Sequence, residues 1–518
     1  MERAGPTLPE LLAALALSTD LAMSHPLEQG LGTCILSARL AAVLGLGAEQ
    51  RARVFQLALL RHVGCTTESH GIARLVGDEV ALGGRMAPLS GAKGSQYMGA
   101  IARYALTGRG PVDGARAAGR LVAGLPGFRA ANAAICEVAQ GLAGRIVPDP
   151  ELVTEIGSVY ERWDGKGFPG GTAGEAVPLT VRVTQVADLA AALHDLDHPD
   201  PAAVVAERAG SGFDPEVAAA FGANAPELLA ALRVSSRWEE VMRLAPLAVP
   251  LRGEALEGAL RAVADFVDLK SPYLAGHSSG VADLAQAAAG CLRLPASMAA
   301  DVGRAGLVHD LGRVGVSAAV WGRQGPLTAG EWELVRLHPY HTDRVLGRSP
   351  ALGRLAALAS LHHERLDGSG YFRGAPAGQQ PAAARVLAAA DAYHAMREPR
   401  PHRPAMHAEQ AAAELGGDVR AGHLDRDAVD AVLEAAGHRV GRRKTHPGGL
   451  TAREAEVLRL LARGLSTRQI AAALTIAPKT AGNHIQAIYD KAGVSSRAAA
   501  TVFAMRHGLM DPLEEKMG

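Results

Sequence analysis

Apolar residues recur at helical spacing in the last seventy residues of the chain. Thr451 and Glu454 form a Thr-x-x-Glu motif directly before an apolar run, which is typical of a capping box at a helix start. The positions that follow supply one apolar stripe, made of Val457, Leu458, Leu460 and Leu461. Gly464 is placed to end this helix. The pattern therefore predicts a helix that begins after Thr451.

Two further helices are predicted after it. Ser466 is a suitable N-cap for the segment 467–474, and Pro478 stands where a third helix would start, since a missing N–H is harmless there. Ile485 and Ile488 would face inward from this third helix. Ala477 before it offers no capping oxygen. A helix, a tight turn and a polar helix are typical of a helix-turn-helix that enters the DNA major groove.

The composition extends the helical prediction to the whole chain. Hydrophobic residues make up 48% of the 518 residues but aromatic residues only 4%, and Ala and Leu dominate. We therefore expect an all-α fold, and the length predicts about three domains. The apolar run 8–17 is interrupted by Pro9 and Glu10, which favours a helix over a signal peptide. The chain contains no run of 18 apolar residues, which is the length that would predict a membrane span, so we expect a cytoplasmic protein.

Charge and cysteine content narrow the picture only locally. The chain has 53 basic and 53 acidic residues, but from Arg439 to the end 13 Lys/Arg face 6 Asp/Glu. Such a basic excess favours a nucleic-acid partner for this part. The four cysteines are scattered without a C-x-x-C spacing, so we expect neither a disulfide framework nor a thiolate metal site.

The chain also contains an internal repeat. The segment ERWDGKGFPGG at 161–171 recurs as ERLDGSGYFRG at 364–374, and LLRHVGC at 59–65 recurs as LVHDLGR at 307–313. The two offsets, 203 and 248, differ by a single insertion in the first copy, somewhere around 66–130. We interpret this pattern as a duplicated domain.

The two copies differ in their polar residues. The second copy holds a set of imidazoles and carboxylates, which suits a pair of transition-metal ions: His277, His309, Asp310, His338, His362, His363 and Asp391. The first copy has Gln29, Arg61, His62, Ile135, Val159, Tyr160 and Asp188 at the equivalent positions. The apolar pattern and the turn glycines persist in both copies, so the histidines serve chemistry, and the first copy is a scaffold that pairs with the second or senses something.

The second copy resembles the HD-GYP branch of the HD phosphohydrolases. The resemblance covers SPYLAGHSSGVADLA, LVHDLGRVG, GPLTAGEWELVRLHPYHTDRVL, LHHERLDGSGYFRG and ARVLAAADAYHAM. It implies an all-helical domain with two divalent transition-metal ions, Fe or Mn, held by the seven residues above, with Asp310 bridging both. It also implies hydrolysis of a phosphodiester, in the best-known members cyclic di-GMP.

Several positions depart from the family pattern. Arg313 replaces a lysine, Phe372 replaces the proline after Gly370 and Tyr371, and His394 replaces an aspartate. By the resemblance, Asp310 and Arg313 are the expected catalytic residues, and the expected substrate contacts are Arg313, Tyr371, Arg400 and Arg403. The departures leave the substrate open.

The C-terminal segment resembles the LuxR-type regulators, including KTAGNHIQAIYDKAGVSSR. The resemblance implies a four-helix DNA-binding domain. Lys479, Thr480, Asn483 and His484 fall on its recognition helix, and Thr467, Arg468, Lys491 and Arg497 are candidate phosphate contacts.

The sequence thus predicts a degenerate HD-type domain at 1–242, an HD-GYP-like domain at 243–440 and a LuxR-type domain at 446–518, with a basic hinge at 437–449. We expect a homodimeric transcription regulator that binds double-stranded DNA and a nucleotide or phosphoester, and that hydrolyses the latter. The alternative is a metal- or nucleotide-sensing transcription factor without turnover.

Overall fold

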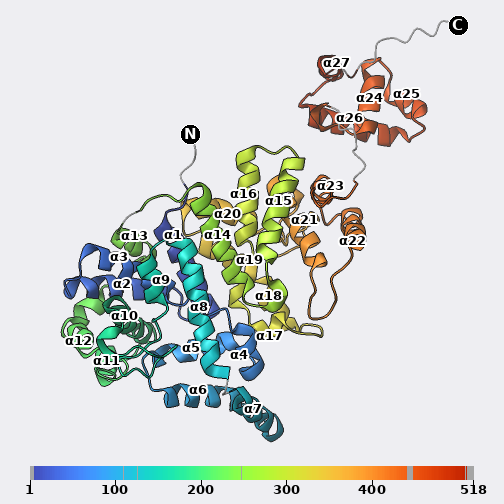
Figure 1. Ribbon diagram of the computed structural model, residues 1–518. Helices are drawn as coiled ribbons and strands as arrows, with labels where there is room; N and C mark the ends of the chain where they lie inside the picture. Colours follow the sequence, from blue (N-terminus) through green and yellow to red (C-terminus); the bar gives the residue numbers. More distant parts are fainter. Residues whose placement is uncertain are drawn as a thin grey trace, which may run out of the picture. The chain divides into compact units, whose positions relative to one another are not determined.

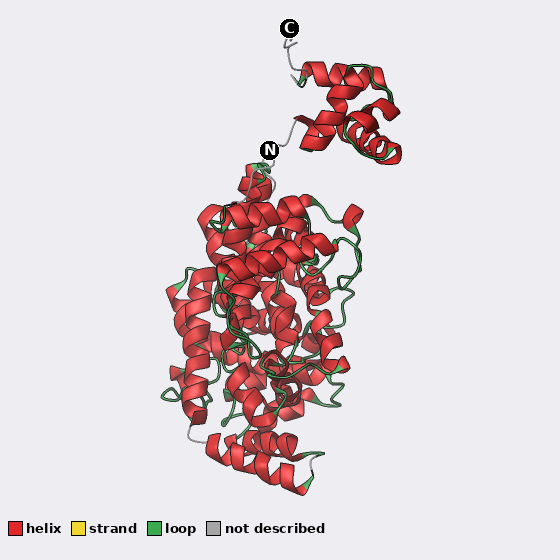
Figure 2. Cartoon of the chain, turned by 90° about the vertical axis from the view of Figure 1, so that its right-hand side faces the viewer, coloured by secondary structure: helices red, strands yellow, loops and turns green. Residues whose placement is uncertain are grey.

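The computed structural model describes residues 5–108, 110–124, 127–246, 248–439, 447–507 and 509. It divides into two compact units, Met1–His438 and Arg439–Gly518. The predicted all-α fold is confirmed, because the described residues form helices and no strand (Figures 1 and 2). None of the described helices is long and apolar enough to cross a membrane. Most of the predicted basic hinge, residues 440–446, lies outside the described residues.

The first unit contains both copies of the repeat. The helices of the first copy are α1 (Leu8–Ala22), α2 (Gln29–Val43), α3 (Ala48–Leu60), α8 (Phe128–Ile146), α9 (Pro150–Ile156), α10 (Leu179–Asp195), α11 (Pro201–Glu207), α12 (Pro215–Ala230) and α13 (Arg237–Leu244). The expected insertion carries four helices of its own, namely α4 (Ser69–Val76), α5 (Glu79–Met86), α6 (Gly94–Leu106) and α7 (Pro111–Gly124).

The second copy repeats the core of the first. Its helices are α14 (Gly253–Asp268), α15 (His277–Cys291), α16 (Ala296–Val308), α17 (Ala318–Trp321), α18 (Ala329–Arg336), α19 (His338–Leu346), α20 (Pro350–Ala359), α21 (Ala382–Arg397), α22 (Ala408–Ala421) and α23 (Arg426–Ala435), with the 3-10 helix η5 (Leu311–Gly315). Helices α15 and α16 begin and end at the positions that the 248-residue offset assigns to α2 and α3. The duplication is therefore one of structure as well as of motif.

Equivalent contacts recur in both copies. The Asp20 carboxylate accepts a hydrogen bond from the Gly30 backbone N–H at 3.1 Å, and Asp268 accepts one from the Ser278 N–H at 3.0 Å. Each carboxylate therefore supports the first turn of the next helix, where free N–H groups attract negative charge. These contacts have survived in the copy that lost its histidines, which indicates a structural role.

One hydrophobic core joins the two copies. Helix α1 is buried on nearly every side, so its apolar run has no amphipathic pattern, and it starts at the Thr7–Glu10 capping box. Its leucines share a core with Leu260 and Phe266 of α14 and with Leu311 of η5. Because large apolar side chains from both copies fill this core, we expect the copies to move as one body.

The second unit is the helical domain expected at the C-terminus, with α24 (Ala452–Ala462), α25 (Thr467–Ala473), α26 (Pro478–Ala492) and α27 (Arg497–Arg506). The predicted capping box at Thr451 and Glu454 is present, and Ser466 caps α25. As expected from Ala477, helix α26 has no side-chain cap. The hydrophobic core of this unit contains Val457, Leu458, Leu461 and Ile488, together with Ile470 of α25.

Candidate metal centre

The expected site is built where η5 meets α19. His309 follows the last turn of α16 and Asp310 precedes η5. The Thr342 hydroxyl donates to the His309 carbonyl at 3.0 Å and accepts from the Gly312 N–H at 2.9 Å, which fastens the two segments together. A Cβ at Gly312 would lie 2.1 Å from the His338 carbonyl oxygen. The glycine of the His-Asp-x-Gly motif is therefore required for close packing against α19.

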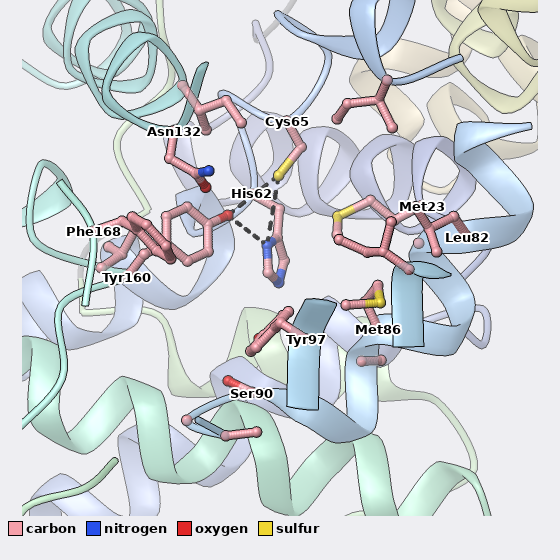
Figure 3. Close-up of a pocket in the computed structure, with 18 of the residues that line it drawn as sticks. Met23, His62, Cys65, Leu82, Met86, Ser90, Tyr97, Asn132, Tyr160 and Phe168 are labelled. Carbon is pink, nitrogen blue, oxygen red and sulfur yellow. Dashed lines mark hydrogen bonds between the residues drawn. The ribbon is translucent and has the colours of Figure 1, made fainter. Parts of the chain in front are cut away.

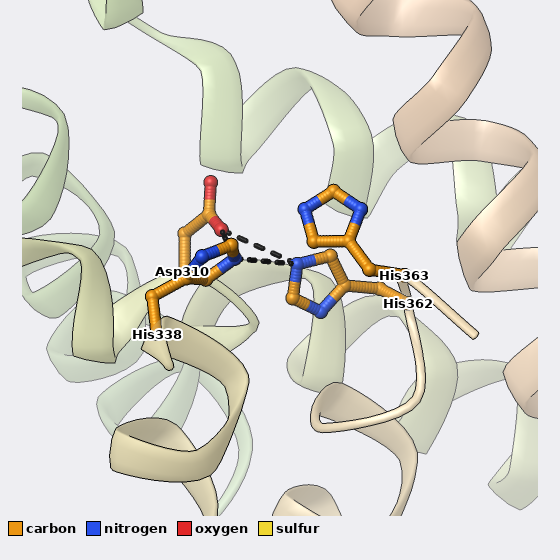
Figure 4. Close-up of side chains that lie close together, drawn as sticks. All are labelled: Asp310, His338, His362 and His363. Carbon is orange, nitrogen blue, oxygen red and sulfur yellow. Dashed lines mark hydrogen bonds and ion pairs between the residues drawn. The ribbon is translucent and has the colours of Figure 1, made fainter. Parts of the chain in front are cut away.

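Asp310 stands at the centre of the site (Figure 4). Its Oδ1 lies 3.3 Å from His338 Nε2 and 3.4 Å from His362 Nε2. Its Oδ2 lies 3.3 Å from His309 Nε2 and 3.6 Å from His277 Nε2. The two oxygens of one carboxylate thus face two different groups of imidazoles.

Asp391 of α21 completes the second group. Its Oδ1 lies 3.3 Å from His277 Nε2 and 3.7 Å from His309 Nε2, and its Oδ2 lies 3.9 Å from His363 Nδ1. The structure therefore brings all seven sequence-predicted residues together in two groups. One group consists of Asp310, His338, His362 and His363, and the other of Asp391, His277 and His309.

Backbone carbonyls accept hydrogen bonds from the Nδ1 atoms of three of these histidines. His309, His338 and His362 each place Nδ1 2.6 to 2.7 Å from the backbone carbonyl three residues earlier. A carbonyl only accepts, so Nδ1 carries the proton in each neutral ring and Nε2 presents its lone pair to the centre. This arrangement is typical of histidines that bind a metal through Nε2.

Charge at the centre is divided between carboxylates and rings. Burial opposes ionisation of Asp310, but Arg313 and His309 outweigh it and hold the pKa of this carboxyl well below its usual range. Burial lowers the pKa of His338 to about 4, against the opposing effect of Asp310. Burial opposes protonation of His309, but Asp310 outweighs it and raises the pKa of this ring to about 10. Once such rings lose their protons, imidazoles around ionised carboxylates are the ligand set that divalent transition metals take.

Buried polar atoms without hydrogen bonds show that this set fits metal ions. His277 Nε2, His309 Nε2 and both Asp310 carboxylate oxygens are buried and receive no hydrogen bond from any described residue. Arg313 pairs with Asp310 Oδ2 at 2.9 Å, but a buried carboxylate whose oxygens accept no hydrogen bond stays costly unless further cations compensate it. These residues are suited to hold divalent cations.

Two residues beside the centre were not among the predicted ligands. Glu398 lies just after α21, with Oε2 2.9 Å from His277 Nδ1 and Oε1 3.1 Å from His394 Nδ1. His394 itself fills the space that Gly280 leaves open, because a Cβ there would lie 2.0 Å from His394 Nε2. The four-residue spacing of His394 and Glu398 was the signal that could have identified this pair.

The expected substrate-binding residues make different contacts around the centre. The Arg313 guanidinium lies 2.9 Å from Asp310 Oδ2 and stacks on Trp321, and Tyr371 packs against the His363 ring. Arg400 pairs with Glu398 at 2.8 Å. Arg403 donates to backbone carbonyls, including that of Ala395, so it braces the loop after α21.

The candidate DNA contacts lie on the expected helices of the second unit. Lys479, Thr480 and Asn483 are exposed on α26, and His484 is half-buried there. Thr467 and Arg468 lie at the start of α25. Two of the candidates also hold the domain together, since Lys491 pairs with Glu454 at 2.8 Å and Arg497 donates to the Leu465 carbonyl at 2.8 Å.

Both parts of the chain match a known protein family. Residues 261–428 match the HD domain family, and residues 449–504 match the family described as bacterial regulatory proteins, luxR family. These matches cover the candidate metal centre and the four-helix domain respectively.

Individual relatives agree with the family matches. A 3'3'-cGAMP-specific phosphodiesterase of Vibrio cholerae is 28% identical over 421 residues, which are 78% of this chain and 90% of that protein. A cyclic di-GMP phosphodiesterase of Pseudomonas aeruginosa is 34% identical over 166 residues, 32% of this chain and 40% of its own length. The crystal structure of a cyclic GMP-AMP specific phosphodiesterase of V. cholerae has the same fold, with a TM-score of 0.58 at 24% identity over 84% of this chain and 99% of that one. The chain therefore carries an HD domain followed by a luxR-family regulatory domain, and it is homologous to the HD-GYP phosphodiesterases.

Proposed function

We propose that this protein is a transcription regulator whose second HD copy is a two-metal phosphodiesterase acting on a cyclic dinucleotide. The observation that carries the proposal is the position of Asp310, whose two buried oxygens face two separate groups of imidazoles. One carboxylate between two histidine groups is the arrangement expected of a residue that bridges two ions. Iron or manganese suits this mixture of imidazole and carboxylate ligands.

The residues of the chain around the ions would bind and orient the substrate. Bound divalent ions at such a centre neutralise phosphate charge and lower the pKa of water. Arg313 is fixed by its stacking on Trp321 and by the ion pair with Asp310. Burial, and then repulsion from Arg313, lowers the pKa of Arg400, which indicates that the two guanidinium groups lie near each other beside the centre. Each also pairs with a carboxylate, Arg313 with Asp310 and Arg400 with Glu398. They are suited to bind the anionic oxygens of a phosphodiester.

The substrate class rests on the relatives. The two relatives above are named for 3'3'-cGAMP and for cyclic di-GMP, and the first is similar to this chain across both copies. Both compounds are cyclic dinucleotides with two phosphodiesters. We therefore propose a cyclic dinucleotide as substrate, and we leave the choice of bases to the experiment.

Product analysis tests this function. Full-length protein, prepared with iron or with manganese, is incubated with 3'3'-cGAMP and with cyclic di-GMP, and the nucleotides are separated by chromatography. We expect one of them to be converted to a linear dinucleotide, and no conversion with the D310A variant. Equal product from D310A, or none from the metal-loaded wild type, would overturn the proposal.

One observation favours a second candidate, a sensor without turnover. The Arg313 guanidinium lies 2.9 Å from Asp310 Oδ2, the oxygen that also faces His277 and His309. A guanidinium in this position competes with a metal ion for the same oxygen. If the chain binds a cyclic dinucleotide tightly and never cleaves it, the sensor is the correct interpretation, and R313K should then restore hydrolysis.

The luxR-family domain provides the output. We propose that it binds double-stranded DNA through α26, with the exposed Lys479, Thr480 and Asn483 toward the bases. One such helix reads few base pairs, so we propose a homodimer on paired half-sites. Because DNA and nucleotides are its proposed partners, we place the protein in the cytoplasm.

A further inference from the structure

A cavity lies in the first copy at the position of the lost metal site. Its volume is about 320 Å³, which is within the lower range of small-molecule sites. Its walls include every residue equivalent to a ligand of the second copy, namely Gln29, Arg61, His62, Ile135, Val159, Tyr160 and Asp188. Figure 3 shows His62, Cys65 and Tyr160 on one side of this space and Met23, Leu82 and Met86 on another. The residues equivalent to the metal ligands therefore line a cavity in the first copy.

The insertion encloses the cavity with apolar side chains. Helices α4, α5 and α6 contribute Ile72, Leu75, Val76, Leu82, Met86 and Ile101. The second copy lacks these helices, so the enclosure is specific to the first copy. Methionine side chains adapt to ligands of different shapes, which is typical of sites for apolar molecules.

The two arginines on the walls are already engaged by acceptors. Arg61 Nε lies 3.0 Å from Asp188 Oδ2, and the rest of its guanidinium donates to the Val159 carbonyl and to Ser90. Arg162 pairs with Asp164 and donates to backbone carbonyls. Lys166 lies exposed at the rim. Because both guanidinium groups are engaged and most of the lining is apolar, the cavity favours an apolar ligand over the two phosphates of a cyclic dinucleotide.

Several buried polar atoms on the wall have no hydrogen-bond partner among the described residues, among them Gln29 Oε1, Glu161 Oε2 and both ring nitrogens of His25. Neither ring nitrogen of His25 has a hydrogen-bond partner among the described residues, although the side chain is only 2% exposed. The nearest carboxylate oxygen, Oδ1 of Asp20, lies 4.0 Å from His25 Nδ1, beyond hydrogen-bond reach. Burial lowers the pKa of His25 to about 3, with a further contribution from His62, so the ring is neutral and can donate from one nitrogen and accept at the other. A buried polar group without a partner indicates that a ligand supplies one.

We propose that this cavity is a regulatory site for a small, uncharged and mainly apolar molecule that carries one hydrogen-bonding group. The apolar walls would bury the body of the molecule, and His25 would bind its polar group. The ligand would act on the metal-bearing copy, a role that rests on the proposed function of that copy.

The path from the cavity to the metal centre is short. Glu79, at the start of α5, borders the cavity and also reaches the second copy. Its carboxylate pairs with buried Lys270 at 2.8 Å, accepts from Ser317 Oγ at 2.7 Å and accepts from the Ala318 N–H at 2.8 Å.

These contacts fix the start of α17. At its end, Trp321 stacks on Arg313 and donates to the Arg313 carbonyl at 3.3 Å. Arg313 in turn pairs with Asp310. A ligand that shifts α5 would therefore change the contacts of Asp310. The size of this effect is limited by the difference between the ligand's affinities for the two positions of α5.

The binding half is tested with N-phenyl-1-naphthylamine, an uncharged aromatic amine whose fluorescence rises in apolar surroundings. Full-length protein should bind it at one site. I101W, which fills the cavity from α6, should weaken binding more than tenfold. R103W, on the exposed side of the same helix, should leave it unchanged. H25F should weaken it by about three- to tenfold, since one hydrogen bond is lost. Equal binding by wild type and I101W would overturn the site, and displacement of the probe by 3'3'-cGAMP would overturn the apolar chemistry.

The coupling half is read without any enzyme activity. Hydrogen exchange of the segment 309–321 is measured by mass spectrometry with and without the probe. We expect the probe to change exchange there in wild type and in R103W, and to change it much less in S317A, which loses one contact to Glu79 but keeps the cavity. Unchanged exchange in wild type with the probe bound would overturn the coupling. Because this readout needs no substrate, its failure is distinguishable from a failure of the proposed hydrolysis.

Discussion

A substitution at Glu398 perturbs the candidate metal centre without altering any of its seven candidate ligands. Its Oε2 lies 2.9 Å from His277 Nδ1, while His277 Nε2 faces Asp310 and Asp391. Burial opposes ionisation of Glu398, but hydrogen bonds from His277 and His394 outweigh it and lower its pKa to about 2. The carboxylate is therefore ionised at neutral pH, and it fixes the His277 proton on Nδ1. The E398Q substitution keeps the shape and removes the charge.

The expected loss follows from this position. A carboxylate behind a metal-binding histidine raises the basicity of the ring, and its removal typically costs about 10- to 100-fold in metal affinity, or about 1.4–2.7 kcal/mol. The Glu398 side chain is only 14% exposed, so solvent screens the charge little. Only the ion on the His277 side of Asp310 should be affected, because His338 and His362 use backbone carbonyls instead.

A competition titration against a chelator measures the two affinities. Wild type and E398Q are compared with E414Q, which removes an exposed carboxylate from α22 in the same copy. We expect E398Q to weaken one of two sites within the stated range and E414Q to weaken neither. If E398Q binds both ions within twofold of wild type, Glu398 does not support His277 and this reasoning is wrong.

Three further predictions concern packing and DNA. The G312A substitution should lower the free energy of unfolding by about 1–3 kcal/mol, because its Cβ would meet the His338 carbonyl; denaturant titration with metal analysis checks this, and an unchanged midpoint would contradict it. R468A should flatten the log–log salt dependence of DNA binding by about one phosphate contact, whereas N483A should relax sequence preference; a changed motif in R468A would reverse these roles. Full-length protein should bind a palindromic site more tightly than the fragment 446–518 and sediment as a dimer, and equal binding with a dimeric fragment would place dimerisation in the DNA-binding unit.

The helical fold could be predicted from the sequence because its determinants are local. Thr451, Glu454 and Ser466 cap the helices that they were expected to cap, and Ala477 leaves α26 without a side-chain cap. The duplication could be predicted because turns and helix starts need particular residues. A Cβ at Gly370 would lie 2.3 Å from the backbone nitrogen of Arg365. A Cβ at Gly167 in the first copy would lie 2.4 Å from the backbone nitrogen of Arg162.

The remaining features depend on contacts that no local pattern reveals. Glu398 reaches His277 from a loop 121 residues away, so its role emerges only when α21 packs against α15. The replacement of His338 and His362 by Ile135 and Val159 indicated a lost metal site, but it did not indicate a cavity. The cavity exists because α4, α5 and α6 enclose these positions, and the sequence predicted an insertion there but not where it packs.

The number of metal ions per chain tests the central claim most directly. Elemental analysis of purified full-length protein should find close to two transition-metal ions per chain in wild type and a site emptied by D310A, since loss of the bridging carboxylate leaves both ions poorly neutralised. The H62A variant, altered at the equivalent position of the first copy, should keep the wild-type content. A wild-type protein that stays without metal after exposure to iron and manganese, or a D310A variant that keeps both ions, would contradict the account.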